Sequence, residues 1–190
     1  MNPTAFQSLT STPQNHWLKR YYFARAAFSV AWVAAAFTIG KQSSMAAALL
    51  LVIYPAWDAV ATLADAQRSG GLRNNPTQKT NVAVSALATV AVAITLGWSM
   101  YAVLGVFGAW AIFSGALQLA TAAHRWKSYG AQWPMILSGA QSMLAGGFLI
   151  YQADGTKSPS IADVAPYAAF GAFYFLISAI SLAISDARRK

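Results

Sequence analysis

The sequence predicts an all-α fold, a bundle of six transmembrane helices built from three helical hairpin repeats. Composition is the first reason, because 57% of the 190 residues are hydrophobic and only 9% are charged. A soluble domain usually carries about 25% charged residues to cover its surface. The second reason is a series of six apolar runs, each close to the roughly 20 residues that a helix needs to cross a bilayer. The third reason is the distribution of basic residues along the chain.

Residues 1–20 are polar and precede the first apolar run. Thr12 followed by Pro13 is a favourable helix start, with the threonine as cap and the proline in the first turn. We expect a short interfacial helix from this point, with Trp17 at the level of the lipid headgroups. Residues 1–20 are therefore expected to be a separate polar segment, and residues 21–187 to be the membrane domain.

The apolar runs predict the six spans, and polar or glycine-rich stretches separate them. The clearest of these breaks is residues 68–79, which contain two glycines and a proline. The turn at residues 97–100 is short, and the loop at residues 153–163 is longer. The spans are expected at residues 21–40, 44–66, 80–96, 101–123, 133–152 and 164–185.

The basic residues predict the orientation of the bundle. In a chain with six spans, ten of the thirteen Lys and Arg residues fall on one side, two fall on the other, and Arg25 lies within the first span. Short cytoplasmic loops carry the excess of Lys and Arg in membrane proteins. We therefore expect both termini in the cytoplasm. Because the basic residues stand at the ends of apolar runs, the +8 net charge indicates contact with anionic lipid rather than nucleic acid.

Parts of the sequence are similar to one another, which predicts an internal repeat. Phe107-Gly108-Ala109-Trp110 aligns with Phe170-Gly171-Ala172-Phe173, and the register continues without gaps to Arg125 and Arg188. The second span fits the same register more loosely. Because each copy would contain two spans, all three copies would point the same way. Repeats of this kind are related by an axis along the membrane normal, whereas inverted-repeat transporters need the opposite relation.

Three charged residues are the sharpest candidates for a site, namely Arg25, Asp58 and Asp65. A charge within a span costs about 2.5–3.5 kcal/mol on insertion scales, so it usually faces the bundle interior and has a partner. Asp58, Thr62 and Asp65 share one helix face, and Arg25 has the reach to meet either carboxylate. Two interpretations remain open. One is a proton or ion site, and the other is a salt bridge that fixes packing, with Asp65 at the interface.

Pro55 and His124 also have two interpretations each. Pro55 lies one turn before Asp58 and frees the carbonyl of Leu51, so it kinks the second span. Such a kink suits a gate beside an ion site, but prolines are also ordinary in membrane helices. His124, with a reference pKa of about 6.5, suits a pH sensor. It also suits a plain interfacial cation near a helix C-terminus.

Small residues recur at helical spacing in the fourth and fifth spans. These faces predict close helix contact, either within one bundle or between subunits. They are Ala111 with Gly115, and Ser138 with Ser142 and Gly146.

The sequence favours no enzyme. It contains no cysteine and no glutamate, and it shows no catalytic triad, phosphate-binding glycine loop or metal-ligand cluster. We therefore expect no catalytic residue, no cofactor and no metal.

Residues 105–151 resemble the HdeD-like family of small bacterial inner-membrane proteins. The resemblance rests on Gly and Trp patterns on either side of the basic turn that contains His124: Gly108-x-Trp110-x-Ile112-x-x-Gly115-x-x-x-Leu119 before it, and Trp133-x-x-x-Leu137-x-Gly139 with Gly146 after it. In layout the resemblance covers residues 20–187. Arg25 and Asp58 resemble charged residues typical of the family's first and second spans, although Ala26 and Ala59 stand where its pattern has glycine.

The resemblance implies six spans made of hairpin repeats, a place in the bacterial inner membrane and a role in acid resistance. It implies no catalytic residues. Three hypotheses follow. The first is a non-enzymatic stress-response protein that acts through packing, lipid or partner contacts. The second is a small channel or transporter for protons or a small solute that uses Arg25 and Asp58. The third is an accessory subunit of a larger complex, or a homo-oligomer.

Overall fold

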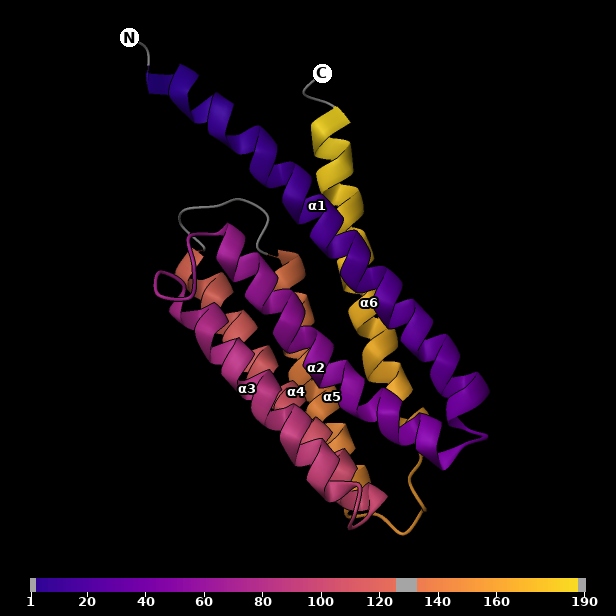
Figure 1. The fold of residues 1–190 in the computed structure, drawn as a ribbon. Helices are drawn as coiled ribbons and strands as arrows, with labels where there is room; N and C mark the ends of the chain where they lie inside the picture. The colour runs from indigo at the N-terminus through magenta and orange to yellow at the C-terminus, as the bar shows by residue number, and fades with distance from the viewer. Residues whose placement is uncertain (1–2, 126–132, 188–190) are drawn as a thin grey trace.

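The computed structural model describes the backbone of residues 3–125 and 133–187, and every described element is helical (Figure 1). This confirms the all-α prediction. The elements are α1 (Pro3–Ala35), the short π-helix η1 (Ala36–Gly40), α2 (Ser44–Arg68), α3 (Pro76–Thr95), α4 (Met100–Arg125), α5 (Trp133–Ala153) and α6 (Ile161–Ala187).

Four helices are long and apolar enough to cross a membrane: His16–Gly40, Ser44–Arg68, Met100–Ala120 and Ile161–Ile184. Large apolar side chains on their outer faces and on neighbouring helices are exposed, for example Met45 at 70% and Leu144 at 76%. Such a surface is unfavourable in water and ordinary against lipid. The chain is therefore a multi-pass membrane protein. The other two helices, α3 and α5, do not meet the same criterion within the described residues. The first turns of α3 contain polar residues such as Gln78 and Lys79.

Local chemistry explains where the helices begin and end. The Ser43 side chain accepts a hydrogen bond from the Ala46 N–H at the start of α2. At the other end of α2, Gly70 and Gly71 have φ angles of 95° and 85°, a left-handed conformation that glycine adopts without strain. Pro76 then stands in the first turn of α3, where its missing N–H needs no partner.

The structure differs from the expectation at the N-terminus. Helix α1 begins at Pro3 and continues without a break into the first membrane span, so Thr12 and Pro13 lie inside a helix and do not start one. A helix that is already nucleated by the apolar span extends readily, because each further residue adds a hydrogen bond. The polar segment is thus the first part of α1.

The helices pack most extensively in the pairs α4–α5, α1–α6 and α2–α3. Each of these pairs joins the second helix of one predicted hairpin to the first helix of another. Figure 1 shows the two chain ends and the α2–α3 loop at one end of the bundle, and the α1–α2, α3–α4 and α5–α6 connections at the other.

Interlocked aromatic side chains fill the middle of the bundle. The Tyr54 ring lies 4.9 Å from that of Trp32, 5.9 Å from that of Trp110 and 6.1 Å from that of Tyr167. Most of these contacts are edge-to-face, the geometry that aromatic quadrupoles favour. Because lipid is as apolar as the side chains, such packing must hold the helices together. The four rings come from α1, α2, α4 and α6, and Asp58 lies one turn after Tyr54 in α2.

Candidate functional site

A buried carboxylate, Asp58, lies at the centre of a polar cluster inside the bundle. Its Oδ1 atom pairs with the Arg25 guanidinium of α1. Its Oδ2 atom accepts hydrogen bonds from Asn81 Nδ2 at 3.0 Å and from Ser85 Oγ at 2.8 Å, both on α3. Only 8% of Asp58 is exposed. Both carboxylate oxygens are thus occupied by donors from two neighbouring helices.

The cluster continues into α4 and back to α2. Trp110 Nε1 donates to Ser85 Oγ at 3.0 Å, so the fully buried Ser85 both accepts and donates. The Asn81 amide also reaches Thr62 Oγ1 at 3.1 Å. The hydrogen bonds therefore connect α1, α2, α3 and α4 through one continuous network.

Arg25 ties the sixth helix to the same network. Its Nη1 atom donates to the Tyr21 hydroxyl at 2.8 Å, and its guanidinium carbon lies 4.2 Å from the ring centroid of Phe175 on α6. A desolvated cation over an aromatic face is worth about 2 kcal/mol. One nitrogen, Nε, is buried without a hydrogen-bond partner. The guanidinium is otherwise shared between a carboxylate, a phenol and an aromatic ring.

The charges of the cluster cancel, which lets it lie at membrane depth. A lone buried charge would be unfavourable by several kcal/mol, whereas a paired and hydrogen-bonded one is tolerated. Removing one partner from a buried pair typically destabilises a protein by about 3–5 kcal/mol, because the other charge stays behind. The arrangement is thus suited to holding helices in register. Three donors from two neighbouring helices hold the Asp58 carboxylate in place.

Asp65 lies two turns further along α2 and has other partners. Its Oδ1 atom accepts from Trp17 Nε1 at 3.1 Å, and its Oδ2 atom accepts from Gln78 Nε2 at 2.6 Å. Arg68 lies over the Trp17 ring, 4.8 Å from its centroid. The structure thus brings Arg25 to Asp58 and leaves Asp65 to fasten α1 to α2 and α3 near one end of the bundle.

Pro55 is buried inside α2, one turn before Asp58, as the sequence places it. Close to this proline, Trp32 Nε1 donates to the Leu50 carbonyl at 2.7 Å. The indole thus bonds the carbonyl adjacent to that of Leu51, which lacks its helical donor because Pro55 has no N–H. His124 lies in the last turn of α4, and its side chain is outside the described part of the structure, as is the whole of residues 188–190.

The small residues of α4 and α5 lie where the two helices touch. A Cβ atom on Gly115 would stand 2.5 Å from the Gly139 carbonyl oxygen, and one on Gly146 would stand 2.5 Å from that of Gly108. Ala111 is fully buried on the same face. Ser138 Oγ donates to Gln118 Oε1 at 3.4 Å between the two helices. Close backbone approach therefore occurs within the bundle.

Sequence reasoning missed three members of the cluster: Asn81, Ser85 and Trp110. A signal for two of them was present, because Asn81 and Ser85 are spaced i, i+4 and so share one face of an otherwise apolar helix. Nothing in the local sequence marks Trp110 as a donor. No three His, Asp or Glu side chains gather to hold a metal in the part of the chain that the structure describes.

Comparison with known protein families gives a match over part of the chain. Residues 83–151 match a family described as "Short repeat of unknown function (DUF308)". No curated protein and no solved structure matches the chain. The matched segment runs from α3 through α4 to the end of α5, and it contains Ser85, Trp110 and the glycine contacts between α4 and α5. The segment that is similar to this short repeat thus lies within a multi-pass membrane protein, and Arg25 and Asp58 lie outside it.

Proposed function

We propose that this chain is a non-enzymatic protein of the HdeD-like type in the bacterial inner membrane, with a role in resistance to acid or a related stress. The pattern that resembles that family lies at residues 105–151, inside the segment that matches the short repeat. In this proposal the Arg25–Asp58 pair is a packing element that holds the helices together.

One observation carries the non-enzymatic part of the proposal: Asp58 has both oxygens engaged. A general base or an ion ligand needs a lone pair that can face its substrate, in a site that substrate can enter. Here the Asp58 carboxylate accepts hydrogen bonds from Arg25, Asn81 and Ser85. Only 11% of the Asp58 side chain is exposed. These contacts favour a structural role over turnover.

The test compares three variants by thermal unfolding in mild detergent. Asp58→Asn leaves Arg25 without a counter-charge, and we expect a loss of about 3–5 kcal/mol in the free energy of unfolding. The double variant with Arg25→Gln removes the stranded charge and should recover part of that loss. Asp154→Asn, an acid in the loop after α5, is the matched control and should unfold as the wild type does.

The same variants separate packing from transport. If Asp58 only holds helices together, proton flux into proteoliposomes should equal that of empty vesicles for the wild type and for every variant. A flux that the wild type supports and Asp58→Asn abolishes, with unfolding unchanged, would contradict the proposal.

The stress role needs a separate experiment, because the stability tests do not address it. Deletion of the gene should lower survival after an acid challenge, and the wild-type gene should restore it. The charge-neutral double variant Arg25→Gln/Asp58→Asn should restore survival to the extent that it restores folding. Equal survival with and without the gene would refute the stress role and leave the packing role untouched.

A proton or small-solute transporter that uses Arg25 and Asp58 is the second candidate. Two features near the pair favour it, namely the buried Pro55 one turn from Asp58 and the unpartnered Nε of Arg25. A third is the π-helical turn Ala36–Gly40, which follows α1. Prolines and π-helical turns are frequent where membrane or soluble helices move or bind. The flux measurement above decides between the two candidates.

We also propose that both termini face the cytoplasm. The support is the charge distribution of the sequence together with the arrangement in Figure 1, where the chain ends and the α2–α3 loop share one end of the bundle. That loop region carries Arg68, Arg73 and Lys79, whereas the opposite connections carry Lys41 and Lys157. Three hairpins of like orientation would give this alternation.

A further inference from the structure

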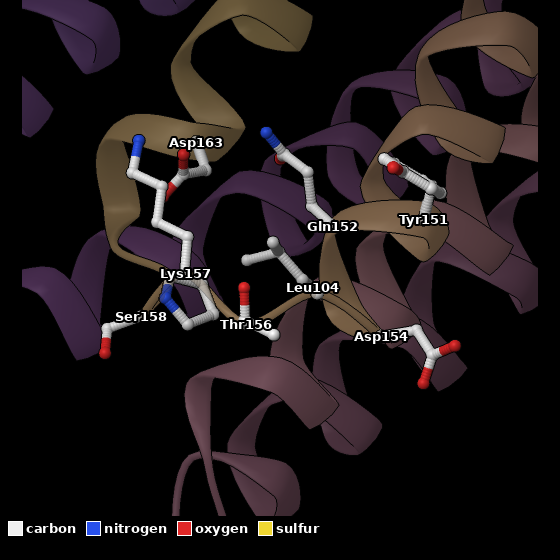
Figure 2. Close-up of a pocket in the computed structure, with 10 residues that line it drawn as sticks. Leu104, Tyr151, Gln152, Asp154, Thr156, Lys157, Ser158 and Asp163 are labelled. Carbon is white, nitrogen blue, oxygen red and sulfur yellow. The ribbon is translucent and has the colours of Figure 1, made fainter.

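At the end of the bundle opposite the chain termini, the structure contains a pocket of about 370 Å³ that the polar cluster does not touch (Figure 2). Leu104 of α4 and Gln152 of α5 form one wall, and the loop after α5 and the start of α6 form the other. A pocket of this size is within the range that holds small ligands. It belongs to a different part of the molecule from Asp58, and an inference drawn from it does not depend on the stress role.

Two polar groups of the pocket are available to a ligand, those of Gln152 and Lys157. The Oε1 atom of Gln152 is buried and has no hydrogen-bond partner. Among the described residues, Lys157 forms no ion pair, although Figure 2 shows it extending toward the side of the pocket where Asp163 lies. A buried carbonyl without a hydrogen-bond partner is unfavourable, and a ligand that donates to it removes that penalty.

The start of α6 is already capped, which limits where an anion can bind. One oxygen of Asp163, Oδ2, accepts from the Ser160 N–H at 2.7 Å and from Ser160 Oγ at 3.2 Å. The helix N-terminus is thus occupied by the chain's own carboxylate. An anionic group in the pocket is therefore left with Lys157, and with the Thr156 hydroxyl that Figure 2 shows pointing toward the centre.

Charge balance indicates a ligand that carries both signs. Lys157 and Asp163 cancel formally, and Asp154 points away from the centre in Figure 2. A single anion would meet one carboxylate, and a single cation would meet one ammonium. A zwitterion can set its cation against Gln152 and Asp163 and its anion against Lys157. The pocket's acceptors call for a cation with N–H groups to donate.

The pocket also lies at the depth where phospholipid headgroups lie. Tyr151, in the last turn of α5, is 75% exposed, and Trp98, in the α3–α4 turn at the same end, is 74% exposed. Exposed Tyr and Trp side chains gather at the interface between membrane and water. Tyr151 itself lines the pocket, so the opening adjoins the lipid-facing surface.

From these observations we propose that the pocket binds phosphoethanolamine chemistry, a primary ammonium joined to a phosphate, with Gln152 and Asp163 on the ammonium and Lys157 on the phosphate. This chemistry is presented by the headgroup of phosphatidylethanolamine or by free phosphoethanolamine. Phosphatidylcholine has the same charges but no N–H on its cation, so it cannot donate to Gln152 Oε1.

The test uses the full chain, stripped of lipid in detergent, and counts retained lipid by native mass spectrometry. Phosphatidylethanolamine, phosphatidylcholine and phosphatidylglycerol with matched acyl chains are added in turn. We expect at least fivefold more phosphatidylethanolamine than either other lipid on the wild type. Lys157→Met and Gln152→Leu should each reduce it at least fivefold.

Lys41→Met is the matched control, because Lys41 is the other lysine at this end of the bundle and lies outside the pocket. It should retain phosphatidylethanolamine as the wild type does. Free phosphoethanolamine is added in a final arm. If it displaces the lipid and stabilises the stripped protein alone, the free compound is the ligand; if it does neither, the headgroup is. Equal retention of phosphatidylethanolamine and phosphatidylcholine, or equal loss in Lys157→Met and Lys41→Met, would overturn the proposal.

Discussion

Alanine at two neighbouring glycines of α5 is expected to change stability in opposite directions. A Cβ atom on Gly146 would lie 2.5 Å from the carbonyl oxygen of Gly108 and 2.9 Å from the backbone nitrogen of Ile112. Both obstacles are backbone atoms of α4, which cannot rotate away as a side chain can. A Cβ atom on Gly147 would meet nothing within 4 Å, because that face of α5 is exposed.

The sizes of the two effects follow from these contacts. At Gly146, α4 and α5 must separate by about 1 Å to restore ordinary contact. Overpacking of this kind typically costs about 1–3 kcal/mol, partly offset by the roughly 1 kcal/mol that alanine gains over glycine in a helix. At Gly147 only that gain applies. We expect the free energies of unfolding of Gly146→Ala and Gly147→Ala to differ by about 2 kcal/mol.

Thermal unfolding in mild detergent, followed by tryptophan fluorescence, measures the difference. For a chain of this size, about 2 kcal/mol corresponds to a shift of roughly 4–8 °C in Tm. Gly147→Ala should unfold at or above the wild-type temperature, and Gly146→Ala below it. If the two variants unfold at the same temperature, the close α4–α5 contact does not exist in the membrane protein, and the reasoning fails.

Two further predictions test the polar cluster and the orientation. Trp110→Phe removes the indole donor to Ser85 Oγ and keeps most of the ring. It should therefore lower the free energy of unfolding by about 1 kcal/mol in the same thermal assay. Trp98→Phe changes an exposed ring, so it is the control and should have no effect. Because the chain has no cysteine, single cysteines report sidedness without background. Gln42→Cys in the α1–α2 turn should react with a membrane-impermeant maleimide in intact cells, whereas Asn74→Cys in the α2–α3 loop should react only after the membrane is opened. Labelling of both residues from outside, or of Asn74→Cys alone, would refute the proposed orientation.

The helices were largely predictable from the sequence because the membrane fixes their length and composition. Backbone chemistry alone marks the end of α2 at Gly70 and Gly71 and the start of α3 at Pro76. The start of α1 was less predictable, since Thr12 and Pro13 form a favourable local cap that the helix does not use. Propagation from an apolar span outweighed the local signal there.

The candidate site was predictable only in part, for a different physical reason. Insertion energetics require Arg25 and Asp58 to find partners, so a pairing between them was foreseeable. Whether Arg25 pairs with Asp58 or with Asp65 depends on how α1 crosses α2. Helical periodicity does not predict that crossing. The role of Trp110 could not be predicted either. The sequence does not show whether a tryptophan in an apolar helix only packs or also donates a hydrogen bond, as Trp110 does to Ser85.

The position of the charges relative to the matched repeat suggests why the bundle carries them. In the alignment that places Trp57 on Trp110, Asp58 falls on Ala111, which is fully buried. The corresponding α4 helix packs on α5 by backbone contact and needs no charge. Helices α2 and α3 contain no glycine, and Asp58 of α2 meets α3 through Asn81 and Ser85 instead. A buried polar network can fix register where close-packed small residues are missing. The Asp58 cluster thus joins α2 to α3 without the glycine contacts that join α4 to α5, and Ser85 and Trp110 are its members within the matched segment.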